Sequence, residues 1–325
     1  MTELQPIIDA VRQAATLCRT VQQTHIVRSD KAGHEPVTIA DYGSQAIISR
    51  MISRVFPHDA VLAEEQGEQF LSLVEAPQRE HIVALLSEIL GESVTEADVV
   101  QWLDYGQGRD AARTWVIDPI DGTKGFLALR RYTIAVGLVV DGQPVAGVMG
   151  SPGYPSPDGM GKIFYAEDGR AYALLMSGGA ASPIHVSTRT AIADIRIAES
   201  VEAAHKDDSA MARVYRAAGF ADATIDRMDG QDKYAAVASG DVDLYLRLPR
   251  GGKSYDHKSW DHAAGVALVQ AAGGQATDID GRPLNFAAGR VMQGTMGMVI
   301  SNGHIHQRVL DAIREAVGEE YNFSA

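Results

Sequence analysis

Cysteine is almost absent from this sequence, which contains a single one, Cys18, in 325 residues. One thiol excludes a disulfide within the chain and a cluster of thiolate metal ligands. Cys18 falls on the apolar side of a helical pattern, so we expect a small buried residue there rather than a nucleophile.

Long hydrophobic runs are missing as well. No segment approaches the roughly 18 consecutive apolar residues that a membrane-spanning helix requires. The first residues, 1–6, lack a basic stretch followed by an apolar core, so no secretory leader is expected. We therefore expect a cytoplasmic protein that has no membrane partner.

Basic residues are outnumbered by acidic ones, with 29 Lys and Arg against 42 Asp and Glu and a formal net charge of -13. Polyanions are repelled by such a surface, which argues against a general binder of nucleic-acid polymers. The sequence also lacks the Gly-x-x-x-x-Gly-Lys-Ser/Thr motif, which disfavours a P-loop nucleotide site. An excess of carboxylates suits cations, although most acidic residues are expected to be solvated surface.

The length of 325 residues exceeds the usual size of a single hydrophobic core and predicts two domains. Residues 1–184 are predicted to be α+β, with an inserted helical hairpin over about 70–113. Residues 185–325 alternate strands and helices, which is typical of an α/β domain. The small, flexible composition around 177–181 places the boundary there or shortly after.

Hydrophobic periodicity predicts the individual elements. Helices are expected over 4–18, from Thr38 to before Pro57, and over 208–218, 231–239 and 260–272, with a last helix at the end. Strands are expected at 60–63, 132–140, 144–150, 162–166, 171–175, 195–199, 223–226, 244–248 and 296–301. The capping box Thr95-Glu-Ala-Asp98 predicts a helix start, and Asp141-Gly142 predicts a hairpin turn.

The most informative stretch is Asp118-Pro-Ile-Asp121-Gly122-Thr123, which follows a short β-branched run. Carboxylate oxygens suit Mg²⁺, and the N–H groups of a helix start suit a phosphate. The same residues are also common in turns, and Asp121 could simply cap a helix. Taken alone, this stretch is about evenly balanced between a site and a turn.

Three other places carry acids that invite a similar explanation. Asp41 has an alternative role in the capping box Thr38-Ile-Ala-Asp41, and the adjacent pair Glu64-Glu65 would ordinarily be solvated. Asp261 could be an acid that faces the dipole of the helix it begins. All of these acids are expected at strand ends or helix starts, where distant segments can converge. Hydrolysis with paired Mg²⁺ ions needs such a cluster.

These motifs together resemble the inositol monophosphatase superfamily of Mg²⁺-dependent, lithium-sensitive phosphatases. The resemblance rests on Glu64-Glu65, on Asp118 to Thr123 and on Trp260-Asp261-His-Ala-Ala-Gly265. It implies a layered αβαβα sandwich. Within the superfamily, Gly-Thr-Lys-Gly-Phe at 122–126 resembles the 3'(2'),5'-bisphosphate nucleotidases, as do Leu244-Tyr-Leu-Arg-Leu-Pro249 and the Lys233-Tyr234 pair.

The resemblance implies two or three Mg²⁺ ions and a division of roles among the acids. Glu64, Asp118 and the carbonyl of Ile120 would hold one ion, and Asp118, Asp121 and Asp261 a second. Asp41, with Glu64 through water, would help to place a third. Asp41 and Thr123 would activate the attacking water, and the N–H groups of Gly122 and Thr123 would hold the scissile phosphate.

For the nucleotide, the resemblance suggests contacts from His205, Lys233 and Arg247. The two cations would meet the phosphate that is not cleaved, a role modestly favoured over the alternative that each is a surface charge. One departure concerns Gly230, which stands where the nucleotidases commonly carry Ser. Asp232 adds a charge that would repel phosphate if it faced the pocket.

The expected activity is removal of the 3'-phosphate of adenosine 3',5'-bisphosphate, and of its sulfated analogue. A phosphatase of the same chemistry acting on inositol phosphates or sugar phosphates is the alternative. A catalytically silent phosphate or nucleotide sensor would be missing one of the expected ligands, and none is missing. The expected partner is a small phosphorylated molecule, and the oligomeric state is left open.

Overall fold

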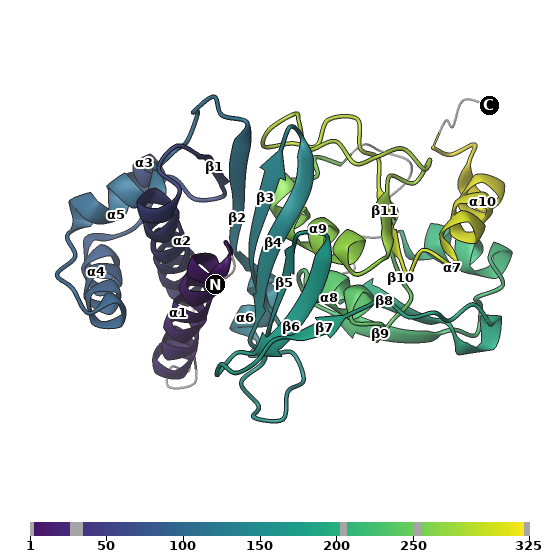
Figure 1. Cartoon of the computed structure of the whole chain (residues 1–325), viewed down its shortest axis with the longest axis horizontal. Helices are drawn as coiled ribbons and strands as arrows, with labels where there is room; N and C mark the ends of the chain where they lie inside the picture. Colours follow the sequence, from purple (N-terminus) through teal and green to yellow (C-terminus); the bar gives the residue numbers. More distant parts are fainter. Residues whose placement is uncertain (1–2, 27–34, 202–206, 250–254, 322–325) are drawn as a thin grey trace.

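The computed structural model describes residues 3–26, 35–201, 207–249 and 255–321. Figure 1 shows alternating layers of helices and sheets, with α1 and α2 on one side of the molecule and α7 and α10 on the other. The α-helices are α1 (Gln5–Val21), α2 (Glu35–Val55), α3 (Gly67–Leu73), α4 (Ala76–Leu90), α5 (Glu96–Leu103), α6 (Thr123–Leu127), α7 (Asp208–Ala217), α8 (Asp232–Ala238), α9 (Ala263–Ala271) and α10 (His306–Val317).

The first sheet has seven strands, which lie side by side in their order along the chain. They are β1 (Ala60–Ala63), β2 (Arg113–Asp121), β3 (Thr133–Val140), β4 (Gln143–Ser151), β5 (Lys162–Glu167), β6 (Arg170–Leu175) and β7 (Ser182–Ile184). β1 and β2 are parallel, and all later neighbours are antiparallel. Asp141-Gly142 turns the chain between β3 and β4 with both residues at positive φ, as the hairpin prediction required.

The second sheet has five strands in the order β11-β12-β10-β8-β9. They are β8 (Arg196–Ser200), β9 (Thr224–Met228), β10 (Leu244–Arg247), β11 (Gln275–Thr277) and β12 (Met298–Ser301). β8, β9 and β10 run parallel, whereas β12 is antiparallel to both of its neighbours. The mixed second half agrees with the predicted alternation of strands and helices.

Helices cover both sheets and separate them. α1 and α2 pack on the outer face of the first sheet, and α7 and α10 lie together beyond the second sheet (Figure 1). α8 and α9 fill the layer between the sheets, where α9 contacts β3 and β4 on one side and β11 and β12 on the other. The expected αβαβα sandwich is confirmed.

Small residues allow the close packing of this middle layer. A Cβ atom at Gly137 of β3 would lie 2.8 Å from the Cβ of Ala263, and one at Gly147 of β4 would lie 3.0 Å from the Cα of Ala264. Because glycine has no side chain, the backbone of α9 rests almost directly on the sheet. α9 therefore brings the preceding residues, Trp260 and Asp261, to the edge of β2 and β3.

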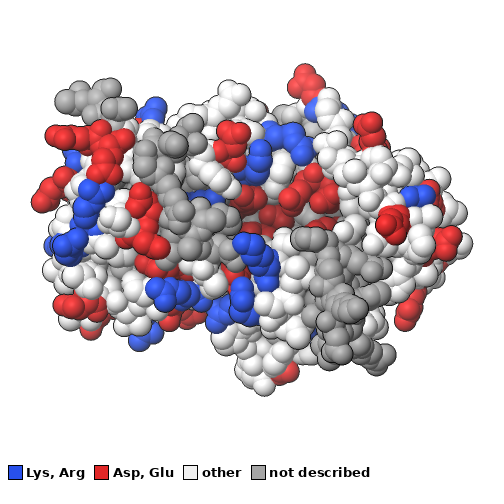
Figure 2. Space-filling view, turned by 180° about the vertical axis from the view of Figure 1, so that it is seen from behind, with Lys and Arg blue, Asp and Glu red and all other residues white. Residues whose placement is uncertain are grey.

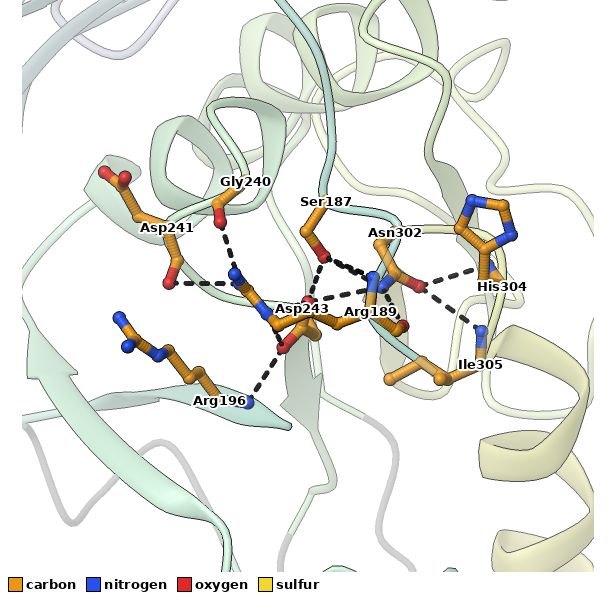
Figure 3. Close-up of polar contacts among 9 residues, drawn as sticks. All are labelled: Ser187, Arg189, Arg196, Gly240, Asp241, Asp243, Asn302, His304 and Ile305. Atoms are coloured by element: carbon orange, nitrogen blue, oxygen red, sulfur yellow. Dashed lines mark hydrogen bonds and ion pairs between the residues drawn. The ribbon is translucent and has the colours of Figure 1, made fainter. Parts of the chain in front are cut away.

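The segment that leads into the second sheet is fixed by a buried polar network around Asp243, at the start of β10 (Figure 3). Asp243 accepts from the Nε of Arg189 at 2.9 Å, from the backbone N–H of Arg196 at 2.8 Å and from Asn302 at 3.2 Å. The hydroxyl of Ser187 also donates to it. The segment that connects the two sheets is thus held in place by hydrogen bonds to Asp243, directly before β10.

Several elements differ from the sequence prediction. α2 begins at Glu35, three residues before the expected start, so Thr38 and Asp41 lie inside a helix and the proposed capping box between them is wrong. Proline at position 36 is tolerated in the first helical turn, which lets the helix start early. Asp261 belongs to a short 3₁₀ turn, Ser259–Asp261, and α9 starts only at Ala263.

The region from about 70 to 113 is helical, as expected. α4 and α5 pack outside α2, and the capping box of Thr95 and Asp98 opens α5. α3 and the three-residue strands β7 and β11 were not predicted. Over the residues described, no helix has both the length and the apolar content to cross a bilayer.

Candidate active site

A cavity of about 340 Å³ opens where the two sheets and the middle helices meet. Figure 2 shows acidic side chains gathered in a hollow near the middle of one face, with basic side chains along its edges. Most of the residues proposed from the sequence line this cavity: Glu64, Asp118, Ile120, Asp121, Gly122, Thr123, Lys233, Arg247 and Asp261. A volume of this size is in the range of small-molecule sites, about 300–1,000 Å³.

A bulge at the end of β2 explains how Asp118 and Asp121 reach the same cavity. In a regular strand, residues three apart point to opposite faces. Here Asp118 pairs with Ala135 and Asp121 pairs with Thr133, so β2 holds one extra residue between these pairs. The hydroxyl of Ser44 in α2 donates to the carbonyl of Pro119 at 3.1 Å and fixes the bulge.

Two glycines form the adjoining wall. Gly122 has a φ of 93° and ends the strand in the left-handed region, which a residue with a side chain rarely adopts. A Cβ atom on Gly122 would lie 3.1 Å from the N of Gly230, and one on Gly230 would lie 2.5 Å from the carbonyl O of Asp121. Gly230 itself has a φ of 58°. The departure from Ser at this position therefore has a steric reason in this chain.

Glu64 comes from the loop after β1, and its neighbour Glu65 is held by α2. The side-chain amide of Gln45 donates to the Glu65 carbonyl at 2.7 Å and accepts from the Glu65 N–H at 2.9 Å. Burial raises the pKa of the Glu65 carboxyl, and a hydrogen bond from the hydroxyl of Tyr42 offsets part of this rise. Of the pair, Glu64 lines the cavity of about 340 Å³, and Glu65 lines another cavity of about 210 Å³.

The carboxylates of the cavity repel one another. Burial, followed by Glu65, Asp261 and Asp121, raises the pKa of Glu64 to about 8. Burial and Asp121 raise the pKa of Asp261 to about 7. Burial, with Glu64 as the first charged cause, also raises the pKa of Asp118. The four carboxylates, which come from three segments, therefore repel one another, and a bound cation would reduce that repulsion.

The donor set fits a hard divalent cation in its chemistry. Asp118 is only 2% exposed, and its Oδ1 is buried without a hydrogen-bond partner. An orphaned carboxylate oxygen facing other carboxylates is suited to Mg²⁺. Among the described residues, however, no three acidic, His or Cys side chains form a ready-made metal site. To share an ion, the carboxylates would have to move closer together. A bound cation would favour this movement because it attracts each of them.

Asp41 does not line the main cavity. It lies in α2 and lines the smaller cavity with Glu65, and burial followed by Glu64 and Glu65 raises its pKa. The hydroxyl of Thr123 donates to the carbonyl of Ile120 at 3.4 Å. Within the described part of the chain, no hydrogen bond joins Asp41 to Thr123, so the proposed relay between them stays a prediction.

The two predicted cations, Lys233 and Arg247, line the cavity on the side of Asp121. The Nζ of Lys233 donates to the carbonyl of Gly230 at 2.5 Å and to that of Met228 at 3.4 Å, which leaves one of its three donors. The guanidinium of Arg247 lies 4.7 Å from the ring of Tyr255. Both cations lower the pKa of Asp121, which burial raises. His205 lies outside the described residues.

Asp232 does not face the cavity. It is fully buried, accepts from the hydroxyl of Thr133 at 2.9 Å, and its pKa is raised to about 6 by burial. The expected repulsion of phosphate by this carboxylate therefore has no basis. Asp229 does line the cavity, where it pairs with Arg130 at 2.9 Å.

Sequence reasoning missed several residues that organise the site. The amide of Gln231 donates to the carbonyl of Trp260 at 3.0 Å and also hydrogen-bonds to Asp121, which lowers the pKa of that carboxyl. Tyr255 lies beside Arg247 and lines the cavity. A single Gln, Tyr or Arg that belongs to no recognisable motif gives no signal in the sequence. These contacts could therefore be found only in the structure.

The sequence matches one protein-family model, described as the inositol monophosphatase family, over residues 2–317. Curated relatives named 3'(2'),5'-bisphosphate nucleotidase extend over nearly the whole chain. Bisphosphate nucleotidase 1 of Candida albicans is 33% identical and covers 96% of this chain and 95% of its own. A probable nucleotidase of Arabidopsis thaliana is 35% identical, with 98% and 96% covered.

Solved structures of similar fold agree with the family match. An inositol monophosphatase of Thermotoga maritima aligns with a TM-score of 0.62 at 23% identity, covering 96% of this chain and 97% of its own. An inositol monophosphatase from Anabaena gives 0.59 at 23% identity, with 97% and 98% covered. At such identities the likeness establishes the fold alone.

Proposed function

The chain belongs to the inositol monophosphatase family, and we propose that it is a 3'(2'),5'-bisphosphate nucleotidase that removes the 3'-phosphate of adenosine 3',5'-bisphosphate. The observation that carries the proposal is one cavity whose lining includes the carboxylates of Glu64, Asp118, Asp121 and Asp261 together with the cations Lys233 and Arg247. The products would be AMP and inorganic phosphate, and the sulfated analogue is a second expected substrate. We expect the enzyme to work in the cytoplasm and to be inhibited by Li⁺.

Glu64, Asp118, Asp121 and Asp261 would hold Mg²⁺, together with the carbonyl of Ile120. When bound, Mg²⁺ supplies positive charge that stabilises the developing negative charge of phosphoryl transfer. The raised pKa values of Glu64 and Asp261 support this role, because a divalent cation is the usual partner that keeps crowded carboxylates ionised.

Thr123 and Asp41 are proposed to activate the attacking water. The hydroxyl of Thr123 would accept a proton from water while Asp41 accepts from Thr123. This relay requires the Thr123 hydroxyl to leave the Ile120 carbonyl, to which it now donates at 3.4 Å, a long and therefore weak hydrogen bond. Direct in-line attack by water needs no covalent enzyme intermediate.

The phosphates would be recognised by separate groups. The N–H groups of Gly122 and Thr123 would hold the scissile phosphate, with Gly122 giving close approach because it lacks a side chain. Lys233 and Arg247 would hold the second phosphate as a point charge and a planar fork, respectively. His205 is proposed as a further nucleotide contact.

The proposal is tested by phosphate release from adenosine 3',5'-bisphosphate, inositol 1-phosphate and fructose 1,6-bisphosphate, each with and without Mg²⁺ and Li⁺. We expect Mg²⁺-dependent release that is fastest from the adenosine compound. Faster release from inositol 1-phosphate or fructose 1,6-bisphosphate would transfer the assignment to that substrate class. No Mg²⁺-dependent release from any of them would contradict a catalytic role and favour a sensor.

Asp121→Asn tests the metal site directly. The substitution removes one carboxylate charge from the cavity while keeping the side-chain shape, so we expect at least a ~100-fold loss of kcat/KM, on the order expected for a lost electrostatic contribution in an active site. Near-normal turnover by the variant would show that Asp121 holds no metal. Asp280→Asn, a substitution outside the cavity, is the matched control and should keep full activity.

A further inference from the structure

The segment 289–292 is bound along the residues that precede Asp261. The N–H of Ser259 donates to the carbonyl of Arg290 at 3.1 Å, and the N–H of Met292 donates to the carbonyl of His257 at 2.8 Å. Lys258 and Val291 form a β-bridge between these contacts. The backbone of Arg290 is therefore fixed relative to the Trp260-Asp261 turn.

The side chain of Arg290 crosses from this segment to the end of β1. Its Nη1 donates to the carbonyl of Ala63 at 3.2 Å, and its Nη2 donates to the carbonyl of Glu64 at 3.4 Å. Its guanidinium carbon also lies 4.7 Å from the ring of Trp260. One planar group thus contacts the residue before Asp261 and the backbone of Glu64.

Glu64 and Asp261 come from segments nearly 200 residues apart in the sequence, and both line the cavity. Carboxylates of like charge on separate segments repel each other, so the separation of Glu64 and Asp261 depends on contacts that join the two segments. Arg290 joins the two segments through hydrogen bonds to backbone carbonyls and through contact with an aromatic ring. Both carboxylates remain in the lining of the cavity. Stacking of a planar cation on Trp is a favourable contact that lysine reproduces poorly.

We propose that Arg290 is a positioning residue, which sets the separation of Glu64 and Asp261 and thereby the affinity of the site for Mg²⁺. This inference rests on the proposed function, in which both acids hold the metal. Removal of groups that orient metal ligands typically lowers metal affinity by about 10–100-fold.

The test compares Arg290→Met and Arg290→Lys with Arg109→Met. Arg109 is a matched control, because its Nη1 donates to the carbonyls of Pro57 and Asp59 at 2.9 and 2.8 Å and its guanidinium lies 5.1 Å from the ring of Tyr105. It makes the same kind of contacts as Arg290, but they join Tyr105 to Pro57 and Asp59 and reach neither Glu64 nor the Trp260-Asp261 turn.

Two readouts are taken with Mg²⁺ as the titrant: its half-saturating concentration in phosphate release, and its effect on melting temperature without substrate. For Arg290→Met, we expect about tenfold more Mg²⁺ to be needed in both, on the scale given above. At saturating Mg²⁺, the KM for adenosine 3',5'-bisphosphate should stay near the wild-type value. Arg290→Lys should recover part of the loss, and Arg109→Met should match the wild type.

Wild-type Mg²⁺ dependence in Arg290→Met would overturn the inference. An equal drop of the metal-free melting temperature in Arg290→Met and Arg109→Met, with no selective change in Mg²⁺ affinity, would also overturn it. Both residues would then stabilise the fold without acting on the metal site. The proposed function fails separately, and the inference with it, if the wild-type protein shows neither Mg²⁺-dependent phosphate release nor a Mg²⁺-dependent rise in melting temperature.

Discussion

At the scale of single residues, the cavity is divided into an acidic part and a basic part. Glu64, Asp118, Asp121 and Asp261 repel one another, but for Asp121 the charges of Lys233 and Arg247 offset part of the rise in pKa that burial causes. Asp121 is therefore the carboxylate at the border between the two parts. With Mg²⁺ held by the acidic part, as proposed, a substrate with one phosphate at the metal and a second phosphate at the two cations would complement the whole cavity.

Arg247→Ala is expected to raise the KM for adenosine 3',5'-bisphosphate by about 10–100-fold, because a charge-assisted contact to one phosphate contributes about 1.5–3 kcal/mol. The KM for a nucleoside monophosphate should change by less than about threefold, because this substrate has no second phosphate that Arg247 could bind. Steady-state phosphate release on the two substrates measures the difference. Arg282→Ala, outside the cavity, serves as the control, and an equal rise of KM on both substrates would contradict a second phosphate site.

The residues of the site could be predicted only where they carried a local signal. Asp118, Asp121, Glu64 and Asp261 lie in recognisable motifs, and each of them lines the cavity. The bulge after Asp118 could not be predicted, because it depends on pairing with β3. Contacts of Gln231 and Arg290 depend likewise on segments that meet only in the folded chain.

At the scale of elements, the contact between α9 and the first sheet decides where Asp261 lies. Gly137 and Gly147 let the helix backbone approach β3 and β4, and Gly265 accommodates the ring of Tyr234 on the other side. Larger residues at these positions would push α9 away from the sheet. The displacement would carry Asp261 with it, away from the acids of β2.

Gly137→Ala tests this packing. The added Cβ would lie 2.8 Å from both the Cβ of Ala263 and the N of Ala264, so the helix must shift. Overpacking of this kind costs about 1–3 kcal/mol. Urea unfolding should show that loss, whereas Val145→Thr, on the exposed face of β4, should change stability by less than about 0.5 kcal/mol. Equal stability of Gly137→Ala and the wild type would mean that this interface is loosely packed.

Elements were predictable where the local pattern was strong. The β3–β4 hairpin carries Asp141-Gly142, and the capping box of Thr95 marks a helix start, so both were found. The short strands β7 and β11 have only three residues each, too few for a periodic pattern. The start of α2 was placed too late because Thr38 resembles a cap, although the helix already runs through it. Whether the two halves are separate domains stays a prediction.

At the scale of the whole molecule, the acidic cavity couples folding to pH. Glu64 and Asp261, with pKa values of about 8 and about 7, bind protons in the folded chain that they release in the unfolded chain, where carboxyl groups titrate near pH 4. The native state therefore binds more protons between those values. By linkage, stability falls as the pH rises through this window.

The free energy of unfolding of metal-free protein should thus be lower at pH 8.5 than at pH 6.5. Urea unfolding in the presence of EDTA measures it, and Glu64→Gln should weaken the dependence because glutamine does not titrate. Saturating Mg²⁺ should reverse the trend, since it stabilises the ionised carboxylates. Higher stability of the metal-free protein at the more alkaline pH would contradict the described clustering of the acids.

The order of the strands and helices along the chain also has a consequence for biosynthesis. Three of the four carboxylates that are proposed to hold Mg²⁺ belong to the first sheet and its loops, and all of that sheet precedes β8 in the sequence. The fourth, Asp261, leaves the ribosome much later, and Arg290 later still. A nascent or truncated polypeptide that ends before these residues lacks part of the catalytic pocket, so we expect turnover only when translation is nearly finished.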